Sequence, residues 1–329
     1  MTPQISVVVP TFRRDALLRQ CLDQLLDQSL APSQYEIIVC DDGPCESTRE
    51  LVEQYQRNGG PVIRYVPVAE TQGPAAARNR GWKCARAEIV AFTDDDCQPA
   101  RDWLAQGFEA IADADAVTGR TVVPVSDPPT DYERDTAGLA SAEFITANCL
   151  CRKSALADVG GFDERFTAAW REDSDLHFSL LERGFRVARA PGMVVVHPVR
   201  PAPWGISVKL QRKGIWDPLL WFKHPRLYAE RIPRYPRLYL VIAMCLVGAA
   251  VGALAGYRRL LVLSILCWIA ATVLFTVRRL RGTTRDPSHV TEMIVTSILI
   301  PPLSLFWRLV GLARWRQETR SPPRRAVEA

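Results

Sequence analysis

Three consecutive carboxylates, Asp94, Asp95 and Asp96, follow an apolar run that ends at Phe92. Such a run is typical of a buried strand, and open α/β folds bind ligands where strands of this kind end. Clustered carboxylates repel one another. A hard divalent cation such as Mg²⁺ or Mn²⁺ takes carboxylate oxygens and bridges to phosphate, so it would neutralise the cluster. A solvated acidic turn explains the same residues, and the cluster alone favours neither interpretation.

A second acidic pair, Asp41 and Asp42, precedes Gly43 at the end of another apolar run. A carboxylate at this point can accept a hydrogen bond from a nucleobase N–H or a ribose hydroxyl. A tight turn with Gly43 at positive φ also accounts for the pair, and in isolation it is the better interpretation. The chain has no P-loop, and no Gly-x-Gly-x-x-Gly follows its first apolar run. This argues against P-loop ATPases and dinucleotide dehydrogenases.

Two further positions carry groups that can do chemistry. Glu172, Asp173 and Asp175 begin a predicted helix, and His197 follows an apolar run. A carboxylate within about 3 Å of a hydroxyl can act as its general base. Acidic residues also stabilise helix N-termini through the helix dipole, which is the simpler account of this cluster when it stands alone. A lone histidine after a strand is usually structural.

The elements that must position these residues alternate in type along the chain. Apolar runs at 5–9, 36–40, 63–66, 88–92 and 193–196 alternate with amphipathic stretches at 16–26, 47–57, 74–87 and 174–184. This alternation predicts a parallel sheet covered by helices, and the continuous Val/Ile runs predict strands buried on both faces. A Pro- and Asp-rich segment at 124–135 predicts a loop.

Taken together, these motifs resemble the family 2 glycosyltransferases. The resemblance lies in residues 7–12, 36–43, 73–79, 94–96, 160–163 with Asn148, and 172–176, in the family's order over about residues 5–200. It implies a GT-A fold, which is an α/β nucleotide-sugar-binding domain with a Rossmann-like mixed sheet flanked by helices. It also implies inverting transfer of a sugar from a nucleotide-sugar donor, with Mg²⁺ or Mn²⁺ as cofactor.

The same resemblance implies roles for individual residues. Asp173 is the expected catalytic base, with Glu172 beside it. The expected metal ligands are Asp96, Asp94 and His197. The residues expected to bind the donor nucleotide are Pro10, Thr11, Phe12, Asp41, Asp42, Arg78, Asn79, Asp94 and Asp95. The chain departs from the family pattern at Arg13, at Pro44 and at Trp170-Arg171, where the family often has Asn, Ser and Gly.

The C-terminal third predicts a membrane region. Residues 238–256 and 260–277 are uncharged, and as helices at about 1.5 Å per residue they match a hydrocarbon core of about 30 Å. A third apolar run, 294–312, contains Pro301-Pro302 and Arg308, so we expect it to be re-entrant or interfacial rather than spanning. The expected domains are a GT-A domain at 1–202, an interfacial amphipathic linker at 203–237, a transmembrane hairpin plus the third segment at 238–312, and a basic tail at 313–329.

Charge and cysteine content bear on location and partners. The net charge is +5, and arginines bracket the apolar runs, which favours lipid headgroups over nucleic acid. By the positive-inside rule both ends of the hairpin face the cytoplasm, and only Arg258 and Arg259 lie outside. No secretory signal is visible, and the nine cysteines lack a Cys-x-x-Cys pair. We therefore expect a multi-pass protein of the inner membrane, with its catalytic domain in the cytoplasm.

The expected activity follows from both parts of the chain. Residues 211–216 lack the Gln-x-x-Arg-Trp spacing of processive polysaccharide synthases, which favours transfer of a single sugar. The anchor favours an acceptor embedded in the membrane, such as a lipid-linked glycan or a polyprenyl phosphate. A catalytically silent nucleotide-sugar sensor or scaffold is the alternative.

Overall fold

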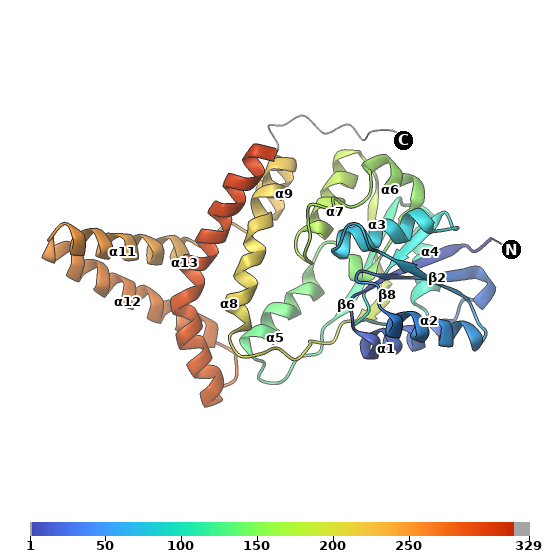
Figure 1. Ribbon diagram of the computed structural model, residues 1–329, viewed down its shortest axis with the longest axis horizontal. Coiled ribbons are helices and arrows are strands. Elements are labelled where there is room, and N and C mark those ends of the chain that lie inside the picture. The colour runs from blue at the N-terminus through green and yellow to red at the C-terminus, as the bar shows by residue number, and fades with distance from the viewer. Residues whose placement is uncertain (1, 319–329) are drawn as a thin grey trace. The chain divides into compact units, whose positions relative to one another are not determined.

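The chain folds into two compact units in a computed structural model that describes residues 2–318, without the side chains of residues 317 and 318 (Figure 1). The first unit contains Met1–Pro124 and Thr136–Val199, and the second contains Val125–Asp135 and Arg200–Ala329. Residues 319–329 of the expected basic tail lie outside the described residues. The segment predicted as a loop at 124–135 thus belongs almost entirely to the second unit, although its flanks belong to the first.

One mixed sheet forms the centre of the first unit, with the strand order β3-β2-β1-β4-β7-β6-β8-β5. Its strands are β1 Ile5–Thr11, β2 Tyr35–Asp41, β3 Val62–Pro67, β4 Ile89–Phe92, β5 Gln98–Pro99, β6 Ala116–Val122, β7 Cys149–Arg152 and β8 Val187–Val196. β3, β2, β1 and β4 are parallel, β7 is antiparallel to β4 and β6, and β8 is parallel to β6. The parallel half was predicted, and the antiparallel β7 makes the sheet mixed.

Helices cover both faces of this sheet because alternate strand residues point to opposite sides. Val7 and Val9 of β1 pack with one set of helices, whereas Val8 packs with the other. The first set is α1 Asp15–Leu26, α2 Glu46–Arg57 and α4 Trp103–Ala110. The second set is α3 Pro74–Cys84, α6 Lys153–Val159 and α7 Glu172–Glu182. The short helices η1 Pro32–Gln34, η2 Ala137–Ser141 and η3 Thr146–Asn148 connect these elements.

The predicted elements of the first unit are present with shifted ends. α3 ends at Cys84, three residues before the predicted end, because Ala85 is extended. α7 begins at Glu172, two residues before the predicted start, so Glu172 and Asp173 lie in its first turn. The predicted loop at 124–135 contains the start of α5, Asp131–Thr136.

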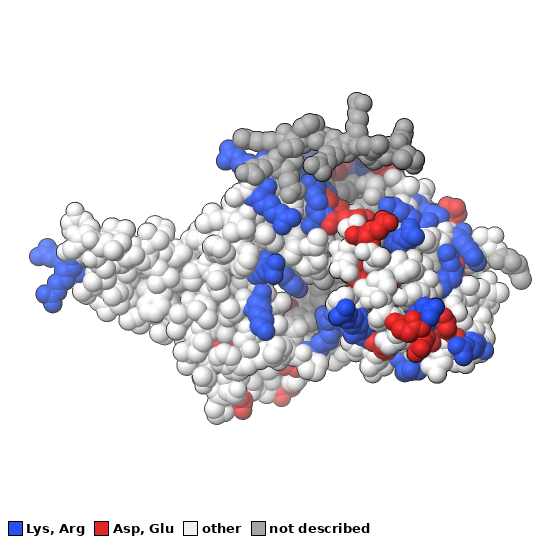
Figure 2. All heavy atoms as spheres, in the orientation of Figure 1, with Lys and Arg blue, Asp and Glu red and all other residues white. Residues whose placement is uncertain are grey.

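The second unit consists of helices. α8 Ile206–Leu210, η4 Gln211–Trp216, α9 Asp217–Lys223 and α10 Pro225–Arg231 precede the hairpin of α11 Arg237–Leu254 and α12 Arg258–Leu280, and α13 Pro287–Glu318 follows it. α11, α12 and α13 are each long and apolar enough to cross a membrane. Figure 2 shows the hairpin almost free of charged side chains, apart from basic ones at the end where α11 turns into α12.

α13 is one continuous helix through Pro301-Pro302, the point at which the sequence predicted an interruption. A proline removes one intrahelical hydrogen bond, but packing against neighbouring helices can hold such a helix together. α13 packs along η4 and α9 and also touches α11 and α12. Figure 1 shows it running across the base of the hairpin rather than alongside it.

Candidate active site

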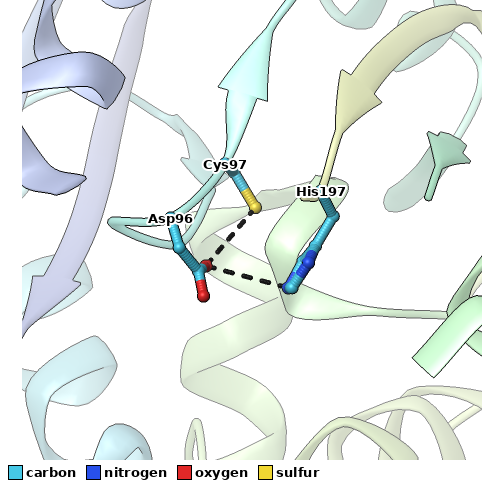
Figure 3. Close-up of side chains that lie close together, drawn as sticks. All are labelled: Asp96, Cys97 and His197. Atoms are coloured by element: carbon cyan, nitrogen blue, oxygen red, sulfur yellow. Dashed lines mark hydrogen bonds and ion pairs between the residues drawn. The ribbon is translucent and has the colours of Figure 1, made fainter. Parts of the chain in front are cut away.

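Asp96, Cys97 and His197 meet at one edge of the sheet (Figure 3). Asp96 and Cys97 follow β4, and His197 follows β8, where its backbone N–H donates to the carbonyl of Val122 at 2.8 Å. His197 Nε2 lies 3.7 Å from Asp96 Oδ1. The ends of strands far apart in the sequence thus bring a carboxylate and an imidazole together, as the sequence predicted for a metal site.

These residues fit a divalent cation. Two ligands that each lie about 2.1 Å from one ion are between about 3 and 4.2 Å apart, and the 3.7 Å separation of His197 Nε2 and Asp96 Oδ1 falls in this range. Within the described residues, the buried Nδ1 of His197 has no hydrogen-bond partner. Burial, followed by the charges of Asp94 and Asp96, raises the pKa of the Cys97 thiol well above its ordinary value. A neutral thiol is a poor ligand for Mg²⁺ or Mn²⁺, so Asp96 and His197 are the better donors.

Arg78 of α3 joins two of the acidic segments. Its side chain is 3% exposed, and it lies 2.7 Å from Asp94 Oδ1 and 3.3 Å from Glu172 Oε1. The guanidinium therefore links the acidic turn after β4 to the first turn of α7. Its direct partners in the structure are these carboxylates, whereas the sequence predicted a role for Arg78 near the nucleotide.

Arg78 and the three carboxyl groups around it, Asp94, Glu172 and Asp173, form one charge cluster. Burial acts to raise the pKa of Asp94, but the charge and hydrogen bond of Arg78, together with the charges of His197 and Arg14, hold this pKa below its ordinary value. Burial and then the charge of Asp173 raise the pKa of Glu172 to about 8. One guanidinium cannot balance three carboxylates, so the buried Glu172 is the one that stays neutral at pH 7.

Asp173, the predicted base, lies in the same turn and accepts a hydrogen bond of 2.5 Å from the hydroxyl of Thr146. Thr146 is fully buried on η3. Burial raises the pKa of Asp173, while Arg78 and the Thr146 hydroxyl oppose the rise. A carboxylate with a raised pKa is a stronger base than an ordinary one, which suits it to accept a proton from a hydroxyl.

The two predicted nucleotide-site aspartates after β2 differ in their surroundings. Asp41 is fully buried, and it accepts hydrogen bonds from the Cys45 N–H at 3.0 Å and the Tyr65 hydroxyl at 2.9 Å. Both carboxylate oxygens of Asp42 accept the N–H of Gly73, at 2.8 and 2.9 Å. Gly73 has φ 122 and directly precedes α3, so Asp42 holds the start of the helix that carries Arg78.

The remaining predicted donor-site residues lie on β1, just after β1, just after β4, or on α3. Asp95 accepts a hydrogen bond from Thr11 at 2.8 Å and lies 3.1 Å from Arg14. Phe12 is 45% exposed, whereas Asn79 is buried and donates to the Phe162 carbonyl at 2.8 Å. Pro10 is half-buried in β1. Phe12 and Pro10 thus retain open surface, while Asp95 and Asn79 bond within the protein.

Sequence reasoning did not single out Thr146, Arg14 or Cys97. Thr146 is a polar residue within a largely apolar stretch, two positions before Asn148, and this contrast was its only signal. Arg14 lies in the turn after β1, and nothing in the sequence indicated that it pairs with Asp95. Cys97 directly follows the acidic turn and was considered only as a scattered cysteine.

Comparison with known proteins shows the family to which the chain belongs. The chain matches the family model for glycosyl transferase family 2 over residues 6–163 and that for glycosyl transferase family group 2 over residues 133–310. Glycosyltransferase AglE of Haloferax volcanii is 27% identical over 212 residues, which cover 60% of this chain and 68% of that protein. The GalNAc(5)-diNAcBac-PP-undecaprenol beta-1,3-glucosyltransferase of Campylobacter jejuni is 34% identical over 94 residues, covering 29% and 30%.

A solved structure supports the fold. Mannosyltransferase PcManGT from Pyrobaculum calidifontis, in complex with GDP-Man and Mn²⁺, aligns with a TM-score of 0.54 at 18% identity, covering 98% of this chain and 89% of that chain. The likeness confirms the GT-A fold that the sequence predicted, with its mixed sheet, flanking helices and following apolar helices.

Proposed function

The chain belongs to the family 2 glycosyltransferases, and from this membership we propose that it transfers a single sugar, with inversion, from a nucleotide-sugar donor to a membrane-embedded acceptor. The acceptor class is a lipid-linked glycan or a polyprenyl phosphate. The hairpin of α11 and α12 supports this choice because it would hold the enzyme at the surface where such acceptors lie. The Campylobacter relative, whose name includes a diphosphate-linked undecaprenol, also supports it.

One observation carries the proposal. Arg78 joins Asp94 to Glu172, which lie on segments far apart in the sequence, and Asp173 follows Glu172 directly. The donor-side acidic turn and the proposed base are therefore parts of one charge network. A reaction that must hold a nucleoside diphosphate and deprotonate a hydroxyl needs this combination.

The reaction would use the residues in distinct roles. Asp173 would take the proton of the acceptor hydroxyl as its oxygen attacks the anomeric carbon opposite the departing nucleoside diphosphate. Glu172, neutral at pH 7, would leave the single charge of Arg78 to Asp94 and Asp173. Asp96 and His197 would hold Mg²⁺ or Mn²⁺, with Asp94 nearby, and the cation would stabilise negative charge on the leaving diphosphate.

Release of nucleoside diphosphate tests this proposal. We would assay the full chain in lipid nanodiscs with a panel of nucleotide sugars and lipid-linked acceptors. Asp173→Asn should lower acceptor-dependent release by about a hundredfold or more, because a positioned general base contributes about 10²–10⁴. The control is Asp158→Asn, whose side chain is 49% exposed on α6. Equal turnover in Asp173→Asn and wild type would remove Asp173 from the mechanism.

Metal dependence has its own test. Removal of divalent cations with a chelator should abolish release, and Mn²⁺ or Mg²⁺ should restore it to wild type but not to Asp96→Ala. Full activity in chelator would contradict the cation's role. Donor binding without turnover, across the whole acceptor panel, would favour a silent nucleotide-sugar sensor instead.

The arrangement in the membrane is also a proposal. The hairpin of α11 and α12 would span the bilayer with Arg258 and Arg259 on the outer side, and α13 would lie in the interface. In support, Arg308 of α13 lies 2.6 Å from Asp217 of α9 and donates to the hydroxyl of Tyr228, so its charge is paired within the second unit. In this proposed arrangement the enzyme would lie in the inner membrane, with its catalytic unit on the cytoplasmic side.

A further inference from the structure

The segment Val125–Asp135 connects two parts of the candidate active site, yet it is built into the helical unit. It follows β6, whose last residue, Val122, accepts the His197 N–H. It precedes η3, which carries Thr146, the hydrogen-bond donor to Asp173. Along the chain, through η2 and η3, the segment therefore leads to the residue that holds the proposed base.

A buried arginine of α12 holds the segment. The side chain of Arg279 is 8% exposed, and its Nη2 lies 2.7 Å from Asp131 Oδ2. Its Nη1 donates to the hydroxyls of Thr296 and Ser297 of α13, at 2.6 and 3.1 Å, and its Nη2 also donates to Ser207 at 3.3 Å. One guanidinium thus joins α8, α12 and α13 to the segment.

Two further hydrogen bonds hold the segment on the connection between α12 and α13. The N–H of Thr284, between α12 and α13, donates to the Pro129 carbonyl at 2.8 Å. Arg134 donates to the Arg281 carbonyl at 2.5 Å and lies 2.8 Å from Asp131. The segment therefore docks through side chains and backbone on the short connection at the end of the hairpin.

The segment is also ordered by its own bonds. Glu133 accepts hydrogen bonds from the Ser126 hydroxyl at 2.8 Å and from the N–H and hydroxyl of Thr130 at 2.7 and 2.9 Å. The segment is thus a preformed turn, and Arg279 binds it through Asp131. Removing the pair of Arg279 and Asp131 should weaken the hold on this turn, while the hydrogen bonds of Thr284 and Arg134 would remain.

Attraction of positive charge to lipid headgroups does not explain why Arg279 is buried. The neighbouring Arg278 is exposed, and with Arg281 and Arg285 it already supplies cationic charge at this end of the hairpin. Exposed arginines serve that purpose at lower cost, because a buried guanidinium has to recover its lost hydration through hydrogen bonds. Arg279 recovers it from Asp131 and three hydroxyls, so its specific function is to hold the segment.

We propose that Arg279 is a positioning residue, which fixes segment 125–135 to the base of the membrane hairpin and thereby sets the use of the lipid-linked acceptor. The proposal rests on the transfer to a membrane acceptor proposed above. The expected effect falls on the acceptor, because the segment leads to Thr146 and Asp173, while the Asp42, Gly73 and Arg78 contacts on the donor side lie outside it.

The test compares Arg279→Met with Arg278→Met in full-length protein in lipid nanodiscs. Both variants remove one positive charge from adjacent positions, but only Arg279 pairs with Asp131. Hydrogen exchange of residues 125–135 should become at least about tenfold faster in Arg279→Met and stay unchanged in Arg278→Met. The KM for the lipid acceptor should rise, or kcat fall, by about tenfold to a hundredfold, with the donor KM unchanged.

Arg279→Lys and Asp131→Asn keep the test informative should Arg279→Met fold poorly. Lysine keeps the charge but loses the fork of donors, so exchange of 125–135 should be intermediate. Unchanged exchange and unchanged acceptor kinetics in Arg279→Lys and Asp131→Asn would overturn the inference, as would equal effects of Arg279→Met and Arg278→Met. Absence of acceptor-dependent turnover in wild type would instead contradict the proposed function, while hydrogen exchange would still report whether Arg279 holds the segment.

Discussion

Arg78 is surrounded by more negative charge than it can balance, and this fixes the protonation of its neighbours. Asp94 and Glu172 lie within 3.3 Å of its guanidinium, and Asp173 is adjacent in the same turn of α7. Because the pKa of Glu172 is raised to about 8, this residue keeps its proton at neutral pH. This leaves the charge of Arg78 to Asp94 and to Asp173, the proposed base.

Glu172→Gln tests this assignment through the pH dependence of stability. The unfolded carboxyl loses its proton near pH 4.5 and the folded one near 8, so between these values only the folded state keeps the proton. This residue therefore makes the free energy of unfolding fall as pH rises through that window. Thermal unfolding from pH 5 to 9 should show a smaller loss in Glu172→Gln than in wild type. The exposed Glu182→Gln is the control, and identical slopes in wild type and Glu172→Gln would contradict the raised pKa.

Thr146→Val tests how Asp173 is held. The hydroxyl of Thr146 lowers the pKa of Asp173, so its removal should raise that pKa and move the acidic limb of the pH–rate profile to higher pH. A hydrogen bond to a charged group is worth about 1.5–3 kcal/mol, which corresponds to about one pH unit or more. Thr146→Ser keeps the hydroxyl and should leave the limb in place. A limb that moves equally in both variants would show that packing, not the hydrogen bond, is responsible.

Two departures from the family pattern have a backbone explanation. Arg13 and Arg171 have φ values of 52° and 75°, in the left-handed region that favours Gly and Asn. The family often has Asn and Gly at these two positions. The sequence alone predicted neither these backbone conformations nor the positions of Arg13 over the Phe12 ring and Arg171 over the Trp170 ring.

Some strands could be predicted from the sequence, whereas others carry no readable pattern. β1, β2 and β4 are continuous apolar runs buried on both faces, and such runs are visible in sequence. β5 contains only Gln98 and Pro99, and β6 mixes Thr, Gly and Arg with Val, so neither has a clear period. The ion pairs of Arg78 depend on three separate segments and could not be derived from spacing.

The α11–α12 hairpin depends on close contact at two glycines. A Cβ at Gly252 would lie 2.6 Å from the Leu261 backbone nitrogen, and one at Gly248 would lie 2.6 Å from the Ser264 hydroxyl. Small residues of this kind let apolar helices approach closely. The tight hairpin was predicted from the short turn, whereas this contact became evident only from the structure.

Gly252→Val should therefore separate the two helices. Its side chain would overlap backbone atoms that cannot move away, at a cost of about 1–3 kcal/mol. We expect a lower midpoint of thermal unfolding, by several degrees, for the protein in detergent micelles. Ala253→Val adds a similar volume at the next position, which is exposed, and should leave the midpoint unchanged. An unchanged midpoint in Gly252→Val would show that the helices do not pack closely here.

The three long apolar helices of the second unit can be arranged in a membrane in more than one way. Length and composition allow α11, α12 and α13 each to cross it. α13, however, runs across the base of the hairpin and packs along η4 and α9 (Figure 1). Helices that cross in this way cannot all follow the bilayer normal. If the hairpin spans, α13 has to lie near the plane of the interface. The ion pair of Arg308 with Asp217 would there offset part of the hydration free energy that both charges lose.

Cysteine accessibility distinguishes these arrangements. In a background without Cys45, Cys84, Cys245 and Cys267, the four cysteines that are not buried, single cysteines would be introduced at Tyr257, Ser288 or Arg316. An impermeant maleimide applied to each face of sealed vesicles should label position 257 from one face and both 288 and 316 from the other. This result is expected because an interfacial α13 keeps its two ends on one side. Labelling of 316 from the same face as 257 would mean that α13 spans the bilayer, and by the positive-inside rule the arginines after it would then be exported against their usual preference.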